Sequence, residues 1–337
     1  MQYRNLGRSN LKVSALCLGT MMFGDQTDAS EAAHIVAHAH ERGVNFIDTA
    51  DVYSIGASER MIGTLLKGHR HDWVLATKLG NKMGERPNQT HYSRSWMVHA
   101  LEQSLLRLQT GHVDICYLHR DYEGMNLEEP LRALDDMLRA GKIRYWGVSN
   151  FRGWRIAEAV RIAGQLGMPG PVVCQPYYNL LNRMPEVEIL PACHHHGIGV
   201  APYSPIARGV LTGKYAPGVK PTADTRAGRA DKRIIETEFR EESLLIAQQL
   251  NAHAKTKGVT LAQFATAWVL ANRIISAVVA GPRTLAQWQD YFPALDCQIS
   301  SEDEALVDSL VHPGHPSTPG YSDPAYPLNG RLPPDKG

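Results

Sequence analysis

Short runs of apolar and β-branched residues recur along the chain and alternate with stretches of helical periodicity. The runs that we interpret as strands are Ala15–Leu18, Val44–Ile47, Val74–Ala76, Val113–Leu118, Ile143–Val148, Val172–Cys174, Gly199–Pro202 and Ala277–Ala280. Between them, apolar residues return every three to four positions, which is typical of amphipathic helices. These helical stretches are Glu31–Arg42, Trp96–Leu108, Leu131–Ala140 and Ile156–Leu166.

Most of the predicted strands start 27 to 30 residues apart, at positions 44 and 74 and again at 113, 143, 172 and 199. That spacing is the length of one βα unit, and parallel strands need a crossover of this kind. The pattern therefore predicts an α/β protein with a (β/α)8 TIM barrel, formed as a single domain by residues 1–311.

Three segments depart from the regular alternation. Tyr3–Val13, centred on Gly7-Arg8-Ser9-Asn10, predicts an N-terminal β-hairpin that plugs the bottom of the barrel. A charged loop rich in Gly, Pro and Ala follows strand 7 at Ser204–Arg233, and a loop of this length in a compact domain is more often functional than accidental. Helical patterns follow it at 238–254 and 261–271. Residues 312–337 form a Pro/Gly-rich tail, which we expect to be disordered or laid over the barrel mouth.

Composition narrows the range of partners and compartments. The 337 residues carry a net charge of +1 with acids and bases interspersed, so we expect neither nucleic acid nor a membrane surface as a partner. Gln2–Asn10 is polar and lacks the apolar core of a signal peptide. The five cysteines are scattered without a CxxC motif, which suits reduced thiols. We therefore expect a cytoplasmic protein whose partner is a small molecule.

Polar residues stand directly after nearly every predicted strand. In barrels of this type the active site lies at the carboxyl ends of the strands. A single polar residue there is usually a solvated loop position, whereas a whole set at equivalent positions favours a site. The set comprises Gly19-Thr20, Asp48, Tyr53, Lys78, His119-Arg120, Ser149-Asn150, Gln175, Tyr203-Ser204 and Arg283.

Four of these residues have a clear joint use in catalysis: Asp48, Tyr53, Lys78 and His119. A phenol is a poor acid near neutrality, but a cation about 4 Å away contributes roughly 4 kcal/mol at an effective dielectric constant of about 20, or about three pKa units. Lys78 is therefore expected to lower the pKa of Tyr53, and Asp48 to keep Lys78 charged. His119 is expected to donate to, or shape the site around, a carbonyl oxygen on which negative charge develops. The alternative is a buried Asp48–Lys78 ion pair without a catalytic task.

The same segments resemble the aldo-keto reductase family, in the bacterial group related to potassium-channel beta subunits. The resemblance covers residues 1 to 295 in unbroken order. It is carried by Asn45-Phe46-Ile47-Asp48-Thr49-Ala50-Asp51-Val52-Tyr53, Gly56-Ala57-Ser58-Glu59, Ala76-Thr77-Lys78, Gly141 to Phe151, Gln175 to Leu180, Tyr203-Ser204-Pro205 and Gly213-Lys214-Tyr215.

By this resemblance the chain is an NADPH-dependent reductase of aldehydes or ketones. Tyr53 is then the general acid, tuned by Lys78 and Asp48, and His119 orients the carbonyl. The family binds NADPH/NADP+ on the barrel mouth without a Rossmann domain, in agreement with the absence of a GxGxxG motif after a strand.

The resemblance also implies where the parts of the cofactor are held. Ser149, Asn150 and Gln175 would hold the carboxamide, Tyr203 would stack on the nicotinamide, Ser204 and Lys214 would contact the pyrophosphate, and Arg283 with Gln287 would receive the 2′-phosphate and adenosine. Arg283 supports a preference for NADPH, since a guanidinium suits a phosphate. The full predicted cofactor set is Gly19, Thr20, Asp48, Ser149, Asn150, Gln175, Tyr203, Ser204, Pro205, Gly209, Lys214, Gly281, Arg283 and Gln287.

Other interpretations remain open. Tyr291 stands where many relatives have Asn, which puts the adenine contact there in doubt. Met21 and Met22 are expected to line a substrate pocket or to pack in the core. His194-His195-His196 is expected to end a helix, and we predict no metal site. The rival functions are a nicotinamide-binding regulatory subunit with slow or no turnover, and a Schiff-base enzyme that uses Lys78.

Overall fold

The computed structural model describes residues 1–327, and its centre is one parallel sheet of eight strands. In spatial order the strands are β10 (Val278–Ala280), β3 (Leu16–Gly19), β4 (Phe46–Asp48), β5 (Val74–Leu79), β6 (Val113–Leu118), β7 (Ile143–Ser149), β8 (Val173–Gln175) and β9 (Gly199–Val200). Parallel bridges from Val200 to Ile275 and from Tyr203 to Val279 join the two edges. The predicted (β/α)8 barrel is thus confirmed, with every strand within a few residues of its expected place.

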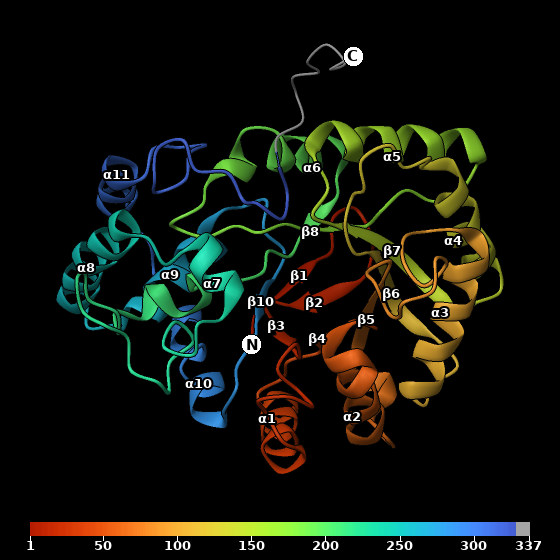
Figure 1. The fold of residues 1–337 in the computed structure, drawn as a ribbon, viewed down its shortest axis with the longest axis horizontal. Coiled ribbons are helices and arrows are strands. Elements are labelled where there is room, and N and C mark those ends of the chain that lie inside the picture. Colours follow the sequence, from red (N-terminus) through yellow and green to blue (C-terminus); the bar gives the residue numbers. More distant parts are fainter. Residues whose placement is uncertain (328–337) are drawn as a thin grey trace.

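Helices surround the strands on the outside (Figure 1). They are α1 (Ala29–Glu41), α2 (Ala57–Leu65), α3 (Arg94–Arg107), α4 (Glu128–Arg139), α5 (Gly153–Leu166), α6 (Ile189–His196), α7 (Lys232–Thr237), α8 (Glu241–Thr256), α9 (Leu261–Ala271), α10 (Leu285–Gln289) and α11 (Ser301–Leu310). The helical patterns of the sequence correspond to α1, α3, α4, α5, α8 and α9. The short helix α7 was not expected, because its six residues are too few to show the repeat of apolar positions that is typical of an amphipathic helix.

Two apolar cores hold the barrel together. An outer core lies between the sheet and the helices, and a smaller inner core fills the barrel with side chains such as Phe46, Ile115 and Tyr117. The N-terminal hairpin, β1 (Tyr3–Asn5) paired with β2 (Lys12–Ser14), adds the fully buried Leu6 and Val13 to this inner core. The hairpin thus closes one end of the barrel, as predicted, and leaves the carboxyl ends of the strands for a site.

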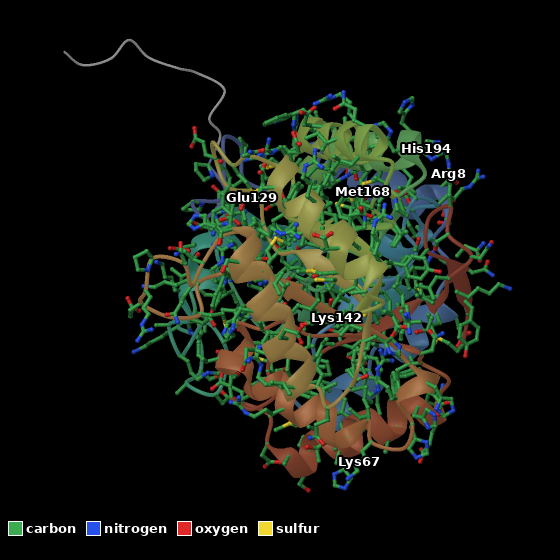
Figure 2. The ribbon with its side chains drawn as sticks, turned by 90° about the vertical axis from the view of Figure 1, so that its right-hand side faces the viewer. Arg8, Lys67, Glu129, Lys142, Met168 and His194 are labelled. Atoms are coloured by element: carbon green, nitrogen blue, oxygen red, sulfur yellow. The ribbon has the colours of Figure 1, made fainter. Side chains whose placement is uncertain are left out.

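The hairpin is fixed to the end of α6. The amide of Arg8 donates to the carbonyl of Gly197 (2.8 Å), and Figure 2 shows Arg8 beside His194. The histidine tract forms the last turn of α6, which ends at Gly197 in a left-handed conformation, φ +68°. The expectation of a helix end at this tract is therefore confirmed. Within residues 1–327 no three His, Cys, Asp or Glu side chains gather in a way that would hold a metal ion.

The described part of the tail, residues 312–327, crosses the barrel mouth. Arg152, which follows β7, donates to the carbonyl oxygens of Tyr326 and Pro327 (both 2.8 Å). Arg120, which follows β6, donates to the carbonyl of Ala325 (2.9 Å). Of the two expectations for the tail, the position over the mouth holds for these residues. Residues 328–337 lie outside the described part, and the domain boundary at residue 312 stays a prediction.

None of the helices in the described part of the chain combines the length and the apolar character needed to cross a membrane.

Candidate active site

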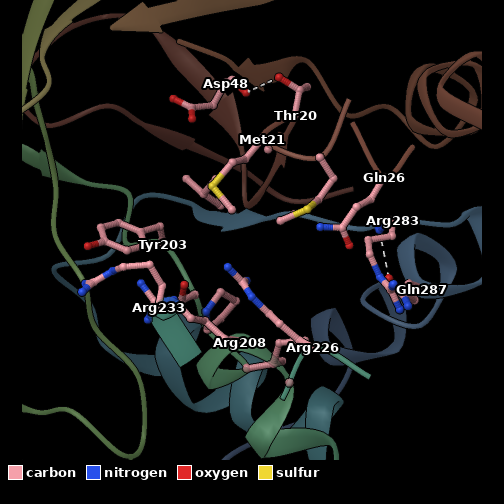
Figure 3. Close-up of a pocket in the computed structure, with 18 of the residues that line it drawn as sticks. Thr20, Met21, Gln26, Asp48, Tyr203, Arg208, Arg226, Arg233, Arg283 and Gln287 are labelled. Atoms are coloured by element: carbon pink, nitrogen blue, oxygen red, sulfur yellow. Dashed lines mark hydrogen bonds between the residues drawn. The ribbon is translucent and has the colours of Figure 1, made fainter. Parts of the chain in front are cut away.

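A cavity of about 360 Å³ opens at the carboxyl ends of the strands. Figure 3 shows Asp48 and Thr20 on one wall, facing Arg208, Arg226 and Arg233. All predicted cofactor residues line this cavity, together with Tyr53 and His119 of the catalytic set. These cofactor residues are Gly19, Thr20, Asp48, Ser149, Asn150, Gln175, Tyr203, Ser204, Pro205, Gly209, Lys214, Gly281, Arg283 and Gln287. Residues far apart in the sequence thus meet in one place.

Strand register brings the acid and the lysine together. Asp48 ends β4 and pairs in register with Ala76 of β5, two residues before Lys78. Every position of β5 is buried, so the Lys78 side chain, 0% exposed, lies behind the cavity wall rather than in it. The chain then turns from Asp48 to Tyr53, where a short 3₁₀ segment (Tyr53–Gly56) contains left-handed residues at Ser54 and Ile55. This turn directs the phenol back to the end of β5.

The Lys78 ammonium is the centre of the catalytic set. It donates to Asp48 Oδ1 in a short ion pair, to the carbonyl of Thr49 (2.9 Å) and to the phenol oxygen of Tyr53 (3.1 Å). Burial lowers the pKa of Lys78, but the charge of Asp48 and the hydrogen bonds outweigh burial, so the pKa lies above its ordinary value. The ammonium therefore stays charged, as expected for the Asp48 role.

The expected pKa of Tyr53 needs a correction. Burial raises the pKa of the phenol, and although Lys78 opposes this shift, the pKa ends above its ordinary value. The nearby cation lowers the pKa of the phenol, but the loss of water around the phenol favours its neutral form and has the larger effect. Lys78 therefore limits the rise rather than producing a phenol that ionises near neutrality. Tyr53 is protonated at physiological pH, as a proton donor must be.

His119 lies beside the phenol with its ring at 81° to that of Tyr53 and the centroids 6.0 Å apart. Burial, and then the charges of Lys78 and Arg120, hold the pKa of His119 well below its usual value. The imidazole is therefore neutral at physiological pH. Its Nδ1 is buried and has no hydrogen-bond partner among the described residues. A neutral ring at this place can donate one hydrogen bond without bringing a second positive charge next to Lys78.

A layer of amides and hydroxyls supports the catalytic set. Gln175 donates to the second oxygen of Asp48 (3.0 Å), and Ser149 donates to the carbonyl of Gln175 (2.9 Å). Asn150, at φ +57°, donates to the carbonyl of His119 (3.0 Å) and accepts a hydrogen bond from the Tyr203 hydroxyl (2.9 Å). The residues predicted to hold the carboxamide are thus linked to each other and to the catalytic residues.

The far end of the cavity carries more positive than negative charge. Lys214, Arg229 and Arg283 form no ion pair within residues 1–327, and all three line the cavity. Partial burial lowers the pKa of Lys214, the charges of Arg283, Arg229 and Arg226 add to this effect, and the charge of Asp224 opposes it. Gly209, at φ +100°, lies beside the Lys214 ammonium, where a Cβ would approach within 3.1 Å. A cluster with such an excess of positive charge is suited to a polyanionic ligand.

Sequence reasoning missed several cavity residues in the 204–233 loop, namely Arg208, Arg226, Arg229 and Arg233, whereas Tyr326 of the tail, expected either to close over the substrate or to be disordered, lines the cavity. The arginines of the charged loop were a signal, but no periodicity fixes which loop side chains turn inward. Met21 and Met22, whose position was left open, both line the cavity. Tyr291 also lines it and is buried, without settling the doubtful adenine contact.

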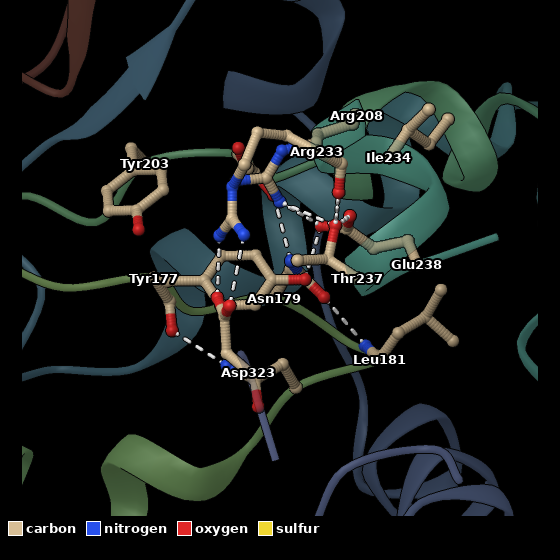
Figure 4. A network of polar contacts seen from close by, with 12 residues as sticks. Tyr177, Asn179, Leu181, Tyr203, Arg208, Arg233, Ile234, Thr237, Glu238 and Asp323 are labelled. Atoms are coloured by element: carbon tan, nitrogen blue, oxygen red, sulfur yellow. Dashed lines mark hydrogen bonds and ion pairs between the residues drawn. The ribbon is translucent and has the colours of Figure 1, made fainter. Parts of the chain in front are cut away.

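A buried polar network lies behind Tyr203 (Figure 4). Arg208 pairs with Glu238 (2.6 Å) and lies over the ring of Tyr177, 5.0 Å from its centroid. Tyr177 in turn stacks on Tyr203 with centroids 5.6 Å apart and 28° between the rings. Arg208 and Glu238 are 8% and 1% exposed at their side chains, so this is a buried ion pair whose partners need each other. The network thus joins the Tyr203 ring, through Tyr177, to Arg208 at the start of the 204–233 loop.

Many enzyme classes use a parallel barrel with its site at this end, and comparison with known proteins identifies the class of this one as an oxidoreductase. The Aldo/keto reductase family model matches residues 15–312. The chain belongs to this family.

Individual relatives match along nearly their whole length. A probable voltage-gated potassium channel subunit beta from Arabidopsis thaliana is 38% identical over 301 residues, 88% of this chain and 92% of the relative. A protein of the same description from Oryza sativa subsp. japonica is 37% identical over 320 residues, 92% of this chain and 97% of the relative. The uncharacterized oxidoreductase YrpG of Bacillus subtilis is 36% identical over 338 residues, 97% of this chain and 99% of the relative. The resemblance noted in the sequence is thus confirmed.

Proposed function

We propose that this protein reduces aldehydes or ketones to alcohols with NADPH, in a reversible hydride transfer. The observation that carries the proposal is the Tyr53 phenol, which meets the charged Lys78 ammonium at 3.1 Å beside a neutral His119 on the cavity wall. A cofactor bound along the cavity would supply the hydride. The protein then has to place the carbonyl, exclude water and deliver a proton.

Each residue of the catalytic set has one task in this proposal. Tyr53 donates its phenolic proton to the carbonyl oxygen and accepts it back in the oxidation direction. Lys78 stabilises the phenolate that results, because its ammonium already donates to the phenol oxygen. Asp48 keeps Lys78 charged in a fully buried position. His119 donates to the carbonyl oxygen, whose negative charge grows during the reaction.

The residues present fit a phosphorylated dinucleotide. The unpaired cations Lys214, Arg229 and Arg283 match the charges of a pyrophosphate and a 2′-phosphate, and Gly209 leaves space beside Lys214. We assign the pyrophosphate to Ser204 and Lys214, the 2′-phosphate to Arg283 and the nicotinamide face to Tyr203. The amide of Arg283 donates to Gln287 Oε1 (2.9 Å), so the two residues are neighbours, in support of assigning both to the adenosine end. We keep the cytoplasm as the proposed compartment, supported by five free cysteines.

The test is consumption of NADPH with a panel of aromatic aldehydes, short aliphatic aldehydes, dicarbonyls and sugars, with NADH run in parallel. Turnover with NADPH that disappears in the Tyr53→Phe variant would support the proposal. Tight NADPH binding without turnover of any carbonyl would reject the reductase. Trapping of a carbonyl substrate on Lys78 by borohydride would favour the Schiff-base alternative instead.

A second candidate is a nicotinamide-binding regulatory subunit with slow or no turnover. It is favoured by the two plant relatives described as probable voltage-gated potassium channel subunits beta. The arrangement of Tyr53, Lys78, Asp48 and His119 speaks for the reductase, because a binding subunit does not need a positioned proton donor. Retention of NADP+ through purification, together with turnover on the scale of hours, would identify the subunit.

A further inference from the structure

Asp51 is a buried acid next to the catalytic set to which the reaction gives no task. It is 0% exposed and lies two residues before Tyr53. Its amide donates to the carbonyl of Lys78 (3.2 Å), so it belongs to the turn that joins Asp48 to Tyr53. Neither carboxyl oxygen has a hydrogen-bond partner in the described part of the chain. An ionised carboxylate in such surroundings would lose water, and the nearby backbone amide of Val52 would compensate only in part.

The two cations near Asp51 make their hydrogen bonds to other groups. All three N–H groups of the Lys78 ammonium have acceptors, in Asp48, Thr49 and Tyr53. Arg107 donates through Nε to Glu59 (2.6 Å) and through Nη2 to Ser104 (3.1 Å). Both cations near Asp51 therefore turn their hydrogen bonds toward other groups.

Glu59 shows the contrast between two buried acids in the same place. It is also 0% exposed, but one carboxyl oxygen accepts from Thr77 (2.6 Å) and the other from Arg107. Both oxygens of Glu59 thus have donors, whereas those of Asp51 have none among the described residues, and the negative charge of Glu59 disfavours ionisation of Asp51.

The charged and titratable groups around Asp51 come from several elements. Burial raises the pKa of Asp51 to about 8, and Glu59 of α2 adds to the rise, whereas Arg107 of α3, the backbone amide of Val52 and Lys78 of β5 oppose it. The other groups whose titration Asp51 affects are Tyr53, Tyr92, Cys116 and Tyr122, and its charge raises the pKa of each. Tyr53 is the one that the reaction uses.

We propose that Asp51 is a positioning residue that acts through Tyr53: as a neutral acid it leaves the Lys78 charge acting on the phenol unopposed, and its ionisation in alkali weakens the proton donor. This inference rests on the proposed reductase function. Asp48 is different, because its negative charge is paired with Lys78 and keeps that ammonium charged. A charge on Asp51 would have no paired cation and would raise the pKa of the phenol.

The kinetic test compares kcat against pH for the wild type and Asp51→Asn, each variant measured relative to its own value at pH 6.5. For the wild type we expect kcat for reduction to fall by roughly threefold to tenfold with a midpoint near pH 8. In Asp51→Asn, which cannot ionise, this step should be absent. Asp25→Asn removes an exposed acid on the loop after β3 and should keep the wild-type profile. An alkaline fall with the same midpoint in Asp51→Asn would overturn the proposal.

A second measurement does not depend on turnover. The infrared difference between wild type and Asp51→Asn at neutral pH should contain the carbonyl stretch of a protonated carboxylic acid, and this band should titrate away near pH 8. A missing band would overturn the neutral Asp51 even in an active enzyme. A band in a protein that reduces no carbonyl would instead reject the reductase while leaving the protonation state of Asp51 established.

Discussion

Asp323 of the tail forms a two-point ion pair with Arg233 at the end of the 204–233 loop. Its carboxylate oxygens accept from Nη1 and Nη2 of the guanidinium at 3.0 and 2.7 Å (Figure 4). The pair is partly exposed, at 29% for Arg233 and 12% for Asp323. It connects the loop that we assign to the cofactor phosphates with the segment that carries Tyr326 over the cavity. The tail segment that covers the cavity and the 204–233 loop are thus held together by this ion pair.

Removing this connection should loosen the tail. For Asp323→Asn we expect the KM for the carbonyl substrate to rise by roughly fivefold, because a partly exposed pair of charge-assisted hydrogen bonds contributes about 1 kcal/mol. Limited proteolysis should cut the tail faster in the variant. Asp135→Asn, which removes the pair with Arg139 on the outer side of α4, is the control. Unchanged cleavage and unchanged KM would show that the tail is held without Asp323.

Tyr53→Phe should abolish proton transfer while leaving the cofactor site intact. We expect kcat to fall by about 10²–10⁴-fold, the usual contribution of a general acid, with NADPH affinity nearly unchanged. Steady-state rates and cofactor fluorescence measure the two quantities. Tyr3→Phe, which removes a hydroxyl bound to the carbonyl of Gly43 on the opposite end of the barrel, controls for the loss of a phenol oxygen. Full turnover in Tyr53→Phe would refute the assigned role.

Asp48→Asn should damage stability as well as catalysis. The substitution leaves a fully buried ammonium without its counter-charge, which costs about 3–5 kcal/mol of unfolding free energy. The pKa of Lys78 is raised in the folded protein, so the folded state holds this proton more tightly than the unfolded chain. The wild type therefore keeps this stabilisation until the pH rises above the ordinary lysine range. In the variant, burial is no longer outweighed by Asp48 and lowers the pKa of Lys78, so the unfolded chain binds this proton more tightly and stability should rise as the pH approaches the ordinary lysine range. Urea unfolding between pH 6 and 10 measures both effects, and equal profiles would contradict them.

Arg283→Ala should separate the two nicotinamide cofactors. Losing charge-assisted contacts to the 2′-phosphate costs about 1.5–3 kcal/mol, which corresponds to roughly 10- to 150-fold weaker NADPH binding, whereas NADH binding should change little. Lys214→Ala is the matched variant, since both cofactors contain the pyrophosphate and both should bind more weakly. Equal losses for NADPH and NADH in Arg283→Ala would place the 2′-phosphate elsewhere.

The sequence predicted the site well where the order of the strands determines which side chains are neighbours. Asp48 and Lys78 lie at the carboxyl ends of the neighbouring strands β4 and β5, and parallel pairing brings them together, as it does Ser149 and Gln175 at the ends of β7 and β8. The sequence was less informative about properties that depend on burial, such as the pKa of a side chain. The raised pKa of Tyr53 depends on how much water the finished cavity excludes, which no local pattern contains. The inward turn of Arg226 in the 204–233 loop and the placement of Tyr326 depend on contacts between segments far apart in the chain.

The register that places Leu16 of β3 against Val278 of β10 also bears on how the protein is made. The first barrel strand finds its second neighbour only when nearly the whole chain has left the ribosome. Until then β3 has one open edge, and contacts of such sequence separation form slowly because a large loop must first close. Chains cut short before residue 278 should consequently present an unpaired strand to other molecules and depend on chaperones. A circular permutant that joins β10 directly to β3 would pair these strands early.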